Sequence, residues 1–328
     1  MSRMFVIVVC ALLFAIVAVL AAMIVLGTSD TPRPLASLAK PFESVDFSDL
    51  PPVERIPAPD RTPIAFRAWH ETPPAPELAP VVIAIHGSSA TSLTLHPLAR
   101  ALAAQGIPVY APDIRGHGDT GSRGDIDYAG ELDDDIADFT AAVAARRPNA
   151  KLVLLGFSSG GGFALHAAAL PVGKMFARAV LLAPMLGVDA PTVNPRQAWA
   201  KPFIPRIIAI ALLNRIGIHV FDHLSVLAFA IPSDRADFLT GRYSFMLMRA
   251  FGTADYVADL RNAAPAISVL VGGKDELFKA DKFAPTIAAV RPDIPVTIVP
   301  GLGHIEMTTS PEAVPAIAAA VRGAYRTR

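Results

Sequence analysis

The feature of this sequence that most restricts its fold is an alternation, from residue 60 onward, between short apolar runs and segments with helical spacing. The apolar runs lie at 81–85, 108–111, 152–155, 179–183, 267–271 and 296–299. The helical segments lie at 94–105, 130–146, 160–170 and about 312–325. This alternation is typical of a parallel α/β sheet, and runs with so little polar character suit strands covered on both faces. The sequence therefore predicts a mostly parallel, twisted sheet flanked by helices.

The alternation is interrupted between Pro184 and Ala266, where we find no clear strand but several helical patterns. We therefore expect an α/β core made of residues 61–184 and 266–328, with residues 185–265 inserted as a helical cap. Within this insertion, the apolar stretch from Phe203 to Leu213 has three possible roles: it lines an acyl tunnel, dips into a bilayer surface or packs against the sheet.

The N-terminus carries a separate signal, an unbroken apolar run from Phe5 to Leu26. As a helix it would extend roughly 33 Å, which matches a bilayer core of about 30 Å. A cleaved secretory signal is the alternative. Such signals have apolar regions of about 7–15 residues and a small-residue cleavage site, and Val25-Leu26-Gly27 is a poor one. We expect residues 1–27 to form a single-pass transmembrane anchor.

Residues 28–60 follow the anchor and are rich in proline, which predicts an irregular tether. The flanking positive charges do not fix the orientation of the anchor, because Arg3 lies on one side and Arg33 and Lys40 on the other. Most single N-terminal anchors place the following domain outside the cytoplasm. We expect the catalytic domain to be extracytoplasmic for that reason.

The composition narrows the classes of partner. Hydrophobic residues make up 52% and charged residues 18% of the 328 residues, so the chain can bury a large core. The net charge of zero gives no sign of a nucleic-acid partner. The single cysteine, Cys10, lies in the apolar run, so the folded part has neither a disulfide nor a thiolate metal site.

The strongest chemical motif is Gly156-Phe157-Ser158-Ser159-Gly160, which lies between a predicted strand and a predicted helix. A sharp strand-to-helix turn exposes a serine hydroxyl at the carboxyl edge of the sheet, and small residues on each side let the turn close. The interpretation is that Ser158 is a nucleophile. A glycine-rich helix start that binds an anion or only packs is the alternative.

A serine needs a base, and the base needs a carboxylate that orients it. Asp275 and His304 follow Ser158 in the expected chain order, each on a loop after a predicted strand. Glu276 competes with Asp275, which a turn or helix cap would also explain, and Asp189 and Asp255 are weaker candidates. The remaining histidines all precede the final strand: His70, His86, His96, His117, His166, His219 and His223.

An oxyanion hole needs two backbone donors. We predict the N–H groups of Ser88, in the loop His86-Gly87-Ser88-Ser89, and of Ser159, directly after the nucleophile. His86 is expected to fix its loop. The turn-rich segment 113–118 contains Arg115 and His117, which are expected to hold loops together, with a direct substrate role as the alternative.

Together, His86-Gly87-Ser88, the segment 113–118, the Ser158 motif and the Asp275/His304 pair resemble the α/β-hydrolase superfamily. The resemblance covers roughly residues 60–328, with the cap matched least, and within the superfamily the chain is similar to the monoacylglycerol lipase and lysophospholipase branch. Those relatives often have Met or Gln where this chain has Ser159, but only the backbone N–H is needed there. The resemblance implies ester hydrolysis by a Ser-Asp-His triad without a cofactor.

The leading functional hypothesis is therefore a serine hydrolase that cleaves lipophilic acyl esters such as monoacylglycerols or lysophospholipids. The apolar insertion and the anchor favour it. Hydrolysis of amides, peptides or C–C bonds by the same triad is the alternative, and a non-catalytic binding protein on the same fold is a third hypothesis.

Overall fold

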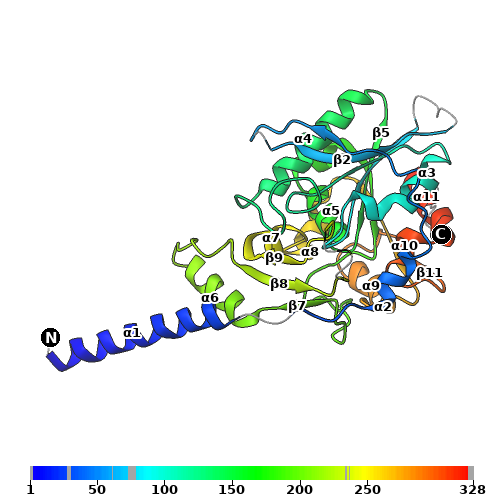
Figure 1. Cartoon of the computed structure of the whole chain (residues 1–328). Helices are drawn as coiled ribbons and strands as arrows, with labels where there is room; N and C mark the ends of the chain where they lie inside the picture. Colours follow the sequence, from blue (N-terminus) through cyan, green and yellow to red (C-terminus); the bar gives the residue numbers. More distant parts are fainter. Residues whose placement is uncertain are drawn as a thin grey trace.

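An eight-stranded sheet forms the centre of the molecule, and a long N-terminal helix extends away from it (Figure 1). This computed structural model describes residues 3–27, 31–60, 62–72, 79–232, 235 and 237–323. The strand order is β1-β2-β4-β3-β5-β6-β10-β11. The strands are β1 (Glu54–Ile56), β2 (Ile64–Trp69), β3 (Pro80–Ile85), β4 (Val109–Pro112), β5 (Lys151–Phe157), β6 (Phe176–Leu182), β10 (Ala266–Gly272) and β11 (Val296–Val299).

All six predicted strands are present, and they pair in parallel from β4 to β11. Strands β1 and β2 were not predicted. They add an antiparallel edge, in which β1 pairs with β2 and β2 pairs with β4. Strand β1 is only three residues long, and the apolar character of β2 is broken by Arg67, so neither run resembles the central strands. The prediction of a mostly parallel sheet is confirmed.

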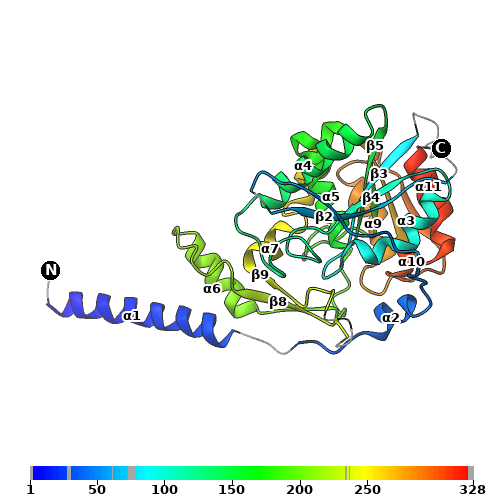
Figure 2. The same ribbon diagram turned by 45° about the horizontal axis from the view of Figure 1, so that its top comes forward.

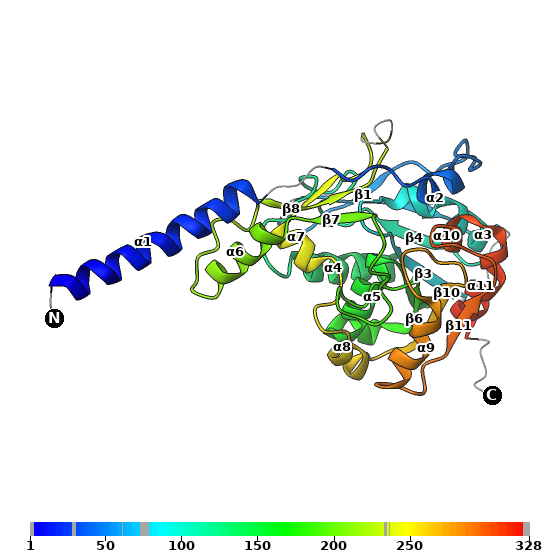
Figure 3. The same ribbon diagram turned by 90° about the horizontal axis from the view of Figure 1, so that it is seen from below.

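Helices cover both faces of the sheet (Figures 2 and 3). Helices α3 and α11 pack together on one face, and α5 and α8 pack together on the other. Between them the central strands are fully buried, as at Leu154, Val180 and Leu270. The helices around the sheet are α3 (His96–Ala103), α4 (Glu131–Arg146), α5 (Ser159–Ala169), α8 (Tyr256–Asn262), α9 (Ala280–Ala288), α10 (Glu306–Thr309) and α11 (Val314–Arg322).

The segment 185–265, which we call the cap segment, contains helices as predicted: α6 (Ile204–Asn214), α7 (Phe245–Ala250) and α8. The expectation that it lacks strands is wrong. It also forms a three-stranded antiparallel sheet of β7 (Ala200–Pro202), β8 (Ser225–Phe229) and β9 (Arg242–Ser244). Two of these strands have three residues each, and runs this short do not show the alternation by which a strand is recognised.

The predicted tether is not a free spacer over its described residues, 31–60, which we call the linking segment. It forms a short helix, α2 (Ala36–Ala39), a 3₁₀ turn and strand β1. Leu38 is buried in the main hydrophobic core, and Leu35 and Leu50 pack against that core. Burial of these apolar side chains stabilises the docked conformation of the segment.

Helix α1 (Arg3–Leu26) covers the predicted anchor and is long and apolar enough to cross a membrane. Most of its side chains are exposed, but its C-terminal end packs against α6 in the cap segment. There the guanidinium of Arg206 donates a hydrogen bond of 2.8 Å to the carbonyl of Ile24. That carbonyl is one of the last four of the helix, which have no partner within it. Arg206 therefore caps α1 from the cap segment.

Candidate active site

Ser158 lies at the sharp turn between β5 and α5, with φ +57° and ψ −121°. This left-handed conformation is rare for residues other than glycine and is typical of strained functional sites. The two glycines of the motif permit the turn. A Cβ on Gly156 would lie 2.2 Å from the carbonyl oxygen of Gly160, and a Cβ on Gly160 would lie 2.1 Å from that of His86. These close backbone contacts therefore require glycine at both positions of the motif.

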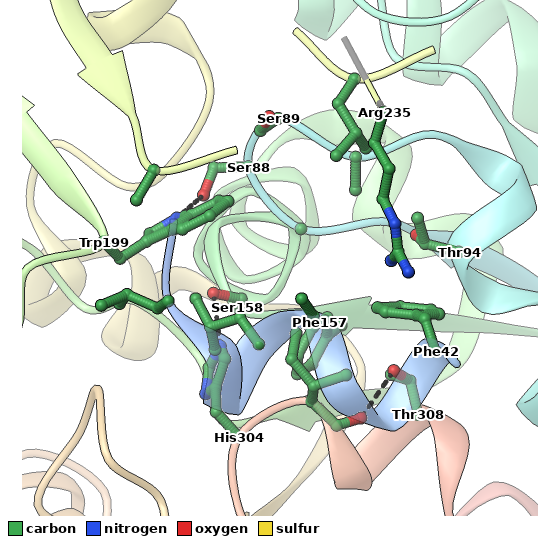
Figure 4. Close-up of a pocket in the computed structure, with 18 of the residues that line it drawn as sticks. Phe42, Ser88, Ser89, Thr94, Phe157, Ser158, Trp199, Arg235, His304 and Thr308 are labelled. Atoms are coloured by element: carbon green, nitrogen blue, oxygen red, sulfur yellow. Dashed lines mark hydrogen bonds between the residues drawn. The ribbon is translucent and has the colours of Figure 1, made fainter. Parts of the chain in front are cut away.

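The structure brings together the three residues predicted as a triad. Nε2 of His304 lies 3.0 Å from Oγ of Ser158, and Nδ1 of His304 lies 2.7 Å from Oδ2 of Asp275. The three come from loops after β5, β10 and β11, which meet at one edge of the sheet because these strands are parallel. His304 and Ser158 face a common pocket (Figure 4).

The two candidate acids, Asp275 and Glu276, have different hydrogen-bond partners. The side chain of Asp275 is fully buried. Its Oδ1 accepts hydrogen bonds from the backbone N–H groups of Leu277 and Phe278, at 2.9 and 2.8 Å. Glu276 accepts the backbone N–H of His304 through Oε2 at 3.0 Å and makes no hydrogen bond with the imidazole in the part of the chain that the structure describes. Asp275 is thus the carboxylate that contacts the ring.

The weaker candidates lie elsewhere. Asp255 caps the N-terminus of α8 by accepting the backbone N–H groups of Val257 and Ala258. Asp189 is exposed. Neither side chain contacts His304.

The predicted oxyanion donors lie beside Ser158. A Cβ on Gly87 would lie 3.3 Å from the Cβ of Ser158, so the loop that carries Ser88 packs directly against Ser158. Among the described residues, the backbone N–H of Ser88 has no hydrogen-bond acceptor. Ser159 is the first residue of α5, where backbone N–H groups have no acceptor within the helix. Both amides are therefore available to an external oxygen.

Three other polar residues from the sequence motifs are buried and hold loops. His86 accepts the backbone N–H of Ile114 at Nε2, and burial lowers its pKa. The guanidinium of Arg115 forms ion pairs with Asp60, Glu131 and Asp135.

His117 is likewise buried, and burial, with the neighbouring His86 adding to it, lowers its pKa well below its usual value. None of these three residues lines the pocket at Ser158. Their predicted role as loop-fixing residues agrees with these contacts.

The pocket at Ser158 has a volume of about 460 Å³ and a mostly apolar lining. One wall comes from the linking segment and another from the cap segment. The linking segment contributes Leu35, Leu38, Ala39, Phe42 and Phe47. The cap segment contributes Trp199, Ala230, Pro232, Arg235, Phe238 and Leu239.

Sequence reasoning missed both walls. The linking segment did carry a usable signal, because Leu35, Leu38, Ala39 and Phe42 follow the i, i+3, i+4, i+7 spacing of an amphipathic helix. The expectation that the stretch 203–213 lines an acyl tunnel is wrong for this pocket, since none of its residues is part of the lining. Phe203, Ala209 and Ile210 are instead buried within the cap segment.

Arg235 is the only lysine or arginine among the lining residues that the structure describes. Its guanidinium points into the pocket and lies 5.8 Å from the centre of the Phe42 ring (Figure 4). No carboxylate pairs with it within the described part of the chain. A cation of this kind offers a binding position for an anionic group of a ligand.

Solved structures with the same fold include several hydrolases. A soluble variant of monoglyceride lipase from Saccharomyces cerevisiae is 16% identical, with a TM-score of 0.63, over 85% of this chain and 96% of that one. A membrane phospholipase A, described as a bacterial virulence factor, is 20% identical, with a TM-score of 0.56, over 98% and 99%. A deformylase from Pseudomonas putida is 19% identical, with a TM-score of 0.55, over 81% and 99%.

No curated protein matches this chain in sequence. The Hydrolase_4 family model, described as serine aminopeptidase, S33, matches residues 76–308. This range includes the Ser158 turn and both loops that carry Asp275 and His304. The chain therefore belongs to this family of α/β-hydrolases and is a serine hydrolase.

Proposed function

We propose that the chain hydrolyses carboxylic esters of lipophilic acyl groups through a Ser158-His304-Asp275 triad. Ser158 Oγ attacks the ester carbonyl while Nε2 of His304 accepts its proton, and the N–H groups of Ser88 and Ser159 stabilise the oxyanion. His304 then protonates the leaving alcohol, which leaves an acyl group on Ser158. Water activated by His304 hydrolyses this acyl-enzyme. The observation that carries the proposal is the continuous hydrogen-bonded chain from Ser158 through His304 to Asp275.

The tautomer of His304 supports these roles. Because Asp275 is fully buried and its Oδ1 already accepts two backbone N–H groups, its Oδ2 is the oxygen that accepts from His304 Nδ1. With the proton on Nδ1, Nε2 is left with a lone pair that faces Ser158 Oγ. The ring is therefore prepared to act as a general base toward the hydroxyl.

The lining of the pocket supports a lipophilic acyl group as the substrate. The side chains of Leu35, Leu38, Phe42, Phe238 and Leu239 offer apolar contacts but few hydrogen bonds. Burial of an acyl chain among them is favourable at about 0.8 kcal/mol per methylene. Monoacylglycerols and lysophospholipids both fit this description.

The cap segment and the anchor support a substrate taken from a membrane. Outside α1, six of the large hydrophobic side chains that are exposed fall within residues 204–220. Three of them, Ile204, Ile208 and Leu212, follow one stripe of α6 at four-residue spacing and are 51%, 46% and 44% exposed. Because α1 packs against α6, a bilayer crossed by α1 would lie next to this stripe.

We propose the corresponding division of the chain: an anchor (1–27), a tether (28–60) that includes the linking segment, the cap segment, and a hydrolase core (61–184 and 266–328). The catalytic domain would lie on the extracytoplasmic side of the membrane. The resemblance in fold to a membrane phospholipase A over 98% of this chain is consistent with this arrangement.

Hydrolysis of an amide or a peptide is the second candidate, because the matched family is described as serine aminopeptidase, S33. The same triad would serve, with an amine as the leaving group. The pocket favours the ester proposal, since a peptide backbone needs hydrogen-bonding partners that a mostly apolar lining offers in small number.

An assay panel separates the two. Full-length protein in detergent is tested on p-nitrophenyl esters from C2 to C16, on 1-monopalmitoylglycerol and on aminoacyl p-nitroanilides. The proposal predicts ester turnover that rises with chain length and is lost in Ser158→Ala. Turnover of the anilides alone would favour the peptidase, and a preference for C2 esters would contradict a lipophilic substrate.

A further inference from the structure

The loop that carries the predicted oxyanion donor is held by the cap segment and not only by the hydrolase core. Ser89 follows Ser88 and has a φ of +66°, a left-handed conformation that needs support from its surroundings. Three hydrogen bonds supply it. The N–H of Ser89 donates to the hydroxyl of Tyr243 at 2.6 Å, its Oγ donates to the carbonyl of Thr240 at 2.7 Å, and its carbonyl accepts the N–H of Thr240 at 2.8 Å.

The direction of each bond around Tyr243 follows from its neighbours. Nδ1 of His117 lies 3.1 Å from the carbonyl of Ile114, which can only accept, so Nδ1 carries the proton. Nε2 of His117 is therefore an acceptor, and the hydroxyl of Tyr243 donates to it. The hydroxyl oxygen of Tyr243 is then free to accept the N–H of Ser89. The bonds run in one direction, from Ser89 through Tyr243 to His117.

Burial restricts the movement of these hydrogen-bonded side chains. Tyr243 is 2% exposed and His117 is fully buried. The ring of Tyr243 packs edge-on against Phe229, with ring centres 4.6 Å apart, so its hydroxyl has little freedom to move. A buried hydroxyl without its partners costs free energy, which keeps the bonds to Ser89 and His117 formed.

A second contact from the cap segment reaches Ser88 itself. The indole N–H of Trp199 donates to Oγ of Ser88 at 3.2 Å (Figure 4). Trp199 thus fixes the side chain of Ser88, and Tyr243 fixes the peptide that joins Ser88 to Ser89. The N–H of Ser88 belongs to the preceding peptide, in which the carbonyl of Gly87 lies 2.8 Å from Nδ1 of His86 and accepts the N–H of Ala90 at 3.3 Å. Contacts from the core and from the cap segment therefore hold Ser88 on both sides of its Cα, and together they set where its N–H points. Oxyanion stabilisation depends on that direction, because the donor must meet the oxygen at about 2.7–3.1 Å.

We propose that Tyr243 is a positioning residue for the oxyanion hole, through which the cap segment, together with His86 of the core, holds the loop so that the Ser88 N–H points toward the oxyanion. This inference rests on the proposed roles of Ser158 and Ser88. It assigns to the cap segment a part in transition-state stabilisation in addition to forming a pocket wall. Tyr243 does not touch the substrate, because it is not among the residues that line the pocket.

The test is Tyr243→Phe, which keeps the ring packed against Phe229 and removes only the hydroxyl. Full-length protein is assayed with a p-nitrophenyl ester for kcat and KM, and with an alkyl trifluoromethyl ketone for Ki. This ketone accepts Ser158 Oγ at its carbonyl carbon, and the adduct carries an oxyanion. We expect kcat to fall about 10- to 100-fold with KM within twofold, because misaligning one donor costs up to about 10²–10³. The Ki should rise by the same factor as kcat/KM falls.

Two further variants complete the design. Tyr128→Phe removes the hydroxyl of an exposed tyrosine, which donates to Asp134, and should leave kcat, KM and Ki unchanged. Trp199→Phe removes the bond to Ser88 Oγ and should weaken ketone binding in the same sense. It also tests how the cap segment positions Ser88 if Tyr243→Phe does not fold, as judged by its melting temperature. Because Trp199 also lines the pocket, the deciding result is then a fall in kcat with KM within twofold.

A folded Tyr243→Phe with wild-type kcat and Ki would overturn the inference. So would a higher KM with unchanged Ki, which would mean a role in substrate binding only. Failure of Ser158 as the nucleophile is distinguishable, because the ketone would then not inhibit the wild-type enzyme at all. An amidase with the same triad would be inhibited by the ketone but would not turn over the ester.

Discussion

Asp275 contacts the imidazole of His304 with one carboxylate oxygen, while its other carboxylate oxygen accepts hydrogen bonds from the backbone. Oδ2 lies 2.7 Å from His304 Nδ1, and Oδ1 accepts the N–H groups of Leu277 and Phe278. The carboxylate therefore cannot rotate without breaking its two hydrogen bonds to the backbone. This fixes both the tautomer and the orientation of the imidazole that faces Ser158.

Replacing Asp275 by Asn should lower kcat by about 10³–10⁴ with little change in KM, because an amide in this position favours the wrong histidine tautomer. Ester hydrolysis by the purified variant measures this. Glu276→Gln is the matched control, since Glu276 contacts only the backbone of His304, and it should lower kcat less than about tenfold. Equal losses in the two variants would mean that Asp275 is not the orienting acid.

Replacing Arg235 by Gln should change head-group preference and leave acyl chemistry intact. The guanidinium of Arg235, which has no carboxylate partner among the residues that the structure describes, is expected to bind the phosphate of a lysophospholipid. The variant should raise KM for 1-palmitoyl-lysophosphatidylglycerol by about 5- to 20-fold. This corresponds to the loss of about 1–2 kcal/mol, which is what a hydrogen bond to a charged group contributes. KM for 1-monopalmitoylglycerol should stay within twofold, and Arg235→Lys should be intermediate. A parallel rise for both substrates would contradict this role.

The exposed stripe of α6 should enter the bilayer surface. An environment-sensitive dye attached to Ile208→Cys, in a Cys10→Ser background, should shift its emission to shorter wavelength when the protein is reconstituted into vesicles. Val188→Cys is the control, because Val188 is 78% exposed but lies outside the 204–220 cluster. Identical spectra at the two positions would show that the stripe does not reach the lipid.

His166 should make stability depend on pH. It lies between Asp133 and Asp259, which together raise its pKa to about 10. A pKa raised in the folded state stabilises fully below the unfolded value near 6.5, and this contribution is lost as pH rises toward about 10. The free energy of unfolding should therefore fall over this range, measured by denaturant titration.

His166→Asn should show a flatter dependence on pH than the wild type. The exposed His70 provides the control, since His70→Asn should keep the wild-type slope. If His166→Asn retains that slope, other groups dominate the pH dependence.

The parallel strands and the site loops could be predicted because each is identified by a short continuous stretch of the sequence. Strands β5 and β10 are continuous apolar runs, and Ser158, Asp275 and His304 each follow such a run. The parallel arrangement then brings the three loops to one edge of the sheet. Residues far apart in the sequence are in this way placed together by topology alone.

The pocket walls could not be predicted in the same way, because they depend on tertiary packing. Strands β7 and β9 are too short to carry a periodic pattern and are held by pairing with β8. The spacing of Leu35, Leu38, Ala39 and Phe42 predicts an apolar helical face in the linking segment, but the surface on which that face docks depends on tertiary packing of Leu38 against the core. The bond between Tyr243 and Ser89 joins residues 154 positions apart and is likewise invisible in the sequence.

The central claim is that Ser158 is the nucleophile, and an activity-based label tests it most directly. Full-length protein is treated with a fluorophosphonate, digested, and the modified peptide is identified by mass spectrometry. The account predicts stoichiometric modification of Ser158, loss of all labelling in Ser158→Ala, and normal labelling in Ser122→Ala, which alters an exposed serine outside the pocket. Undiminished labelling of Ser158→Ala, or modification of a different residue, would contradict it.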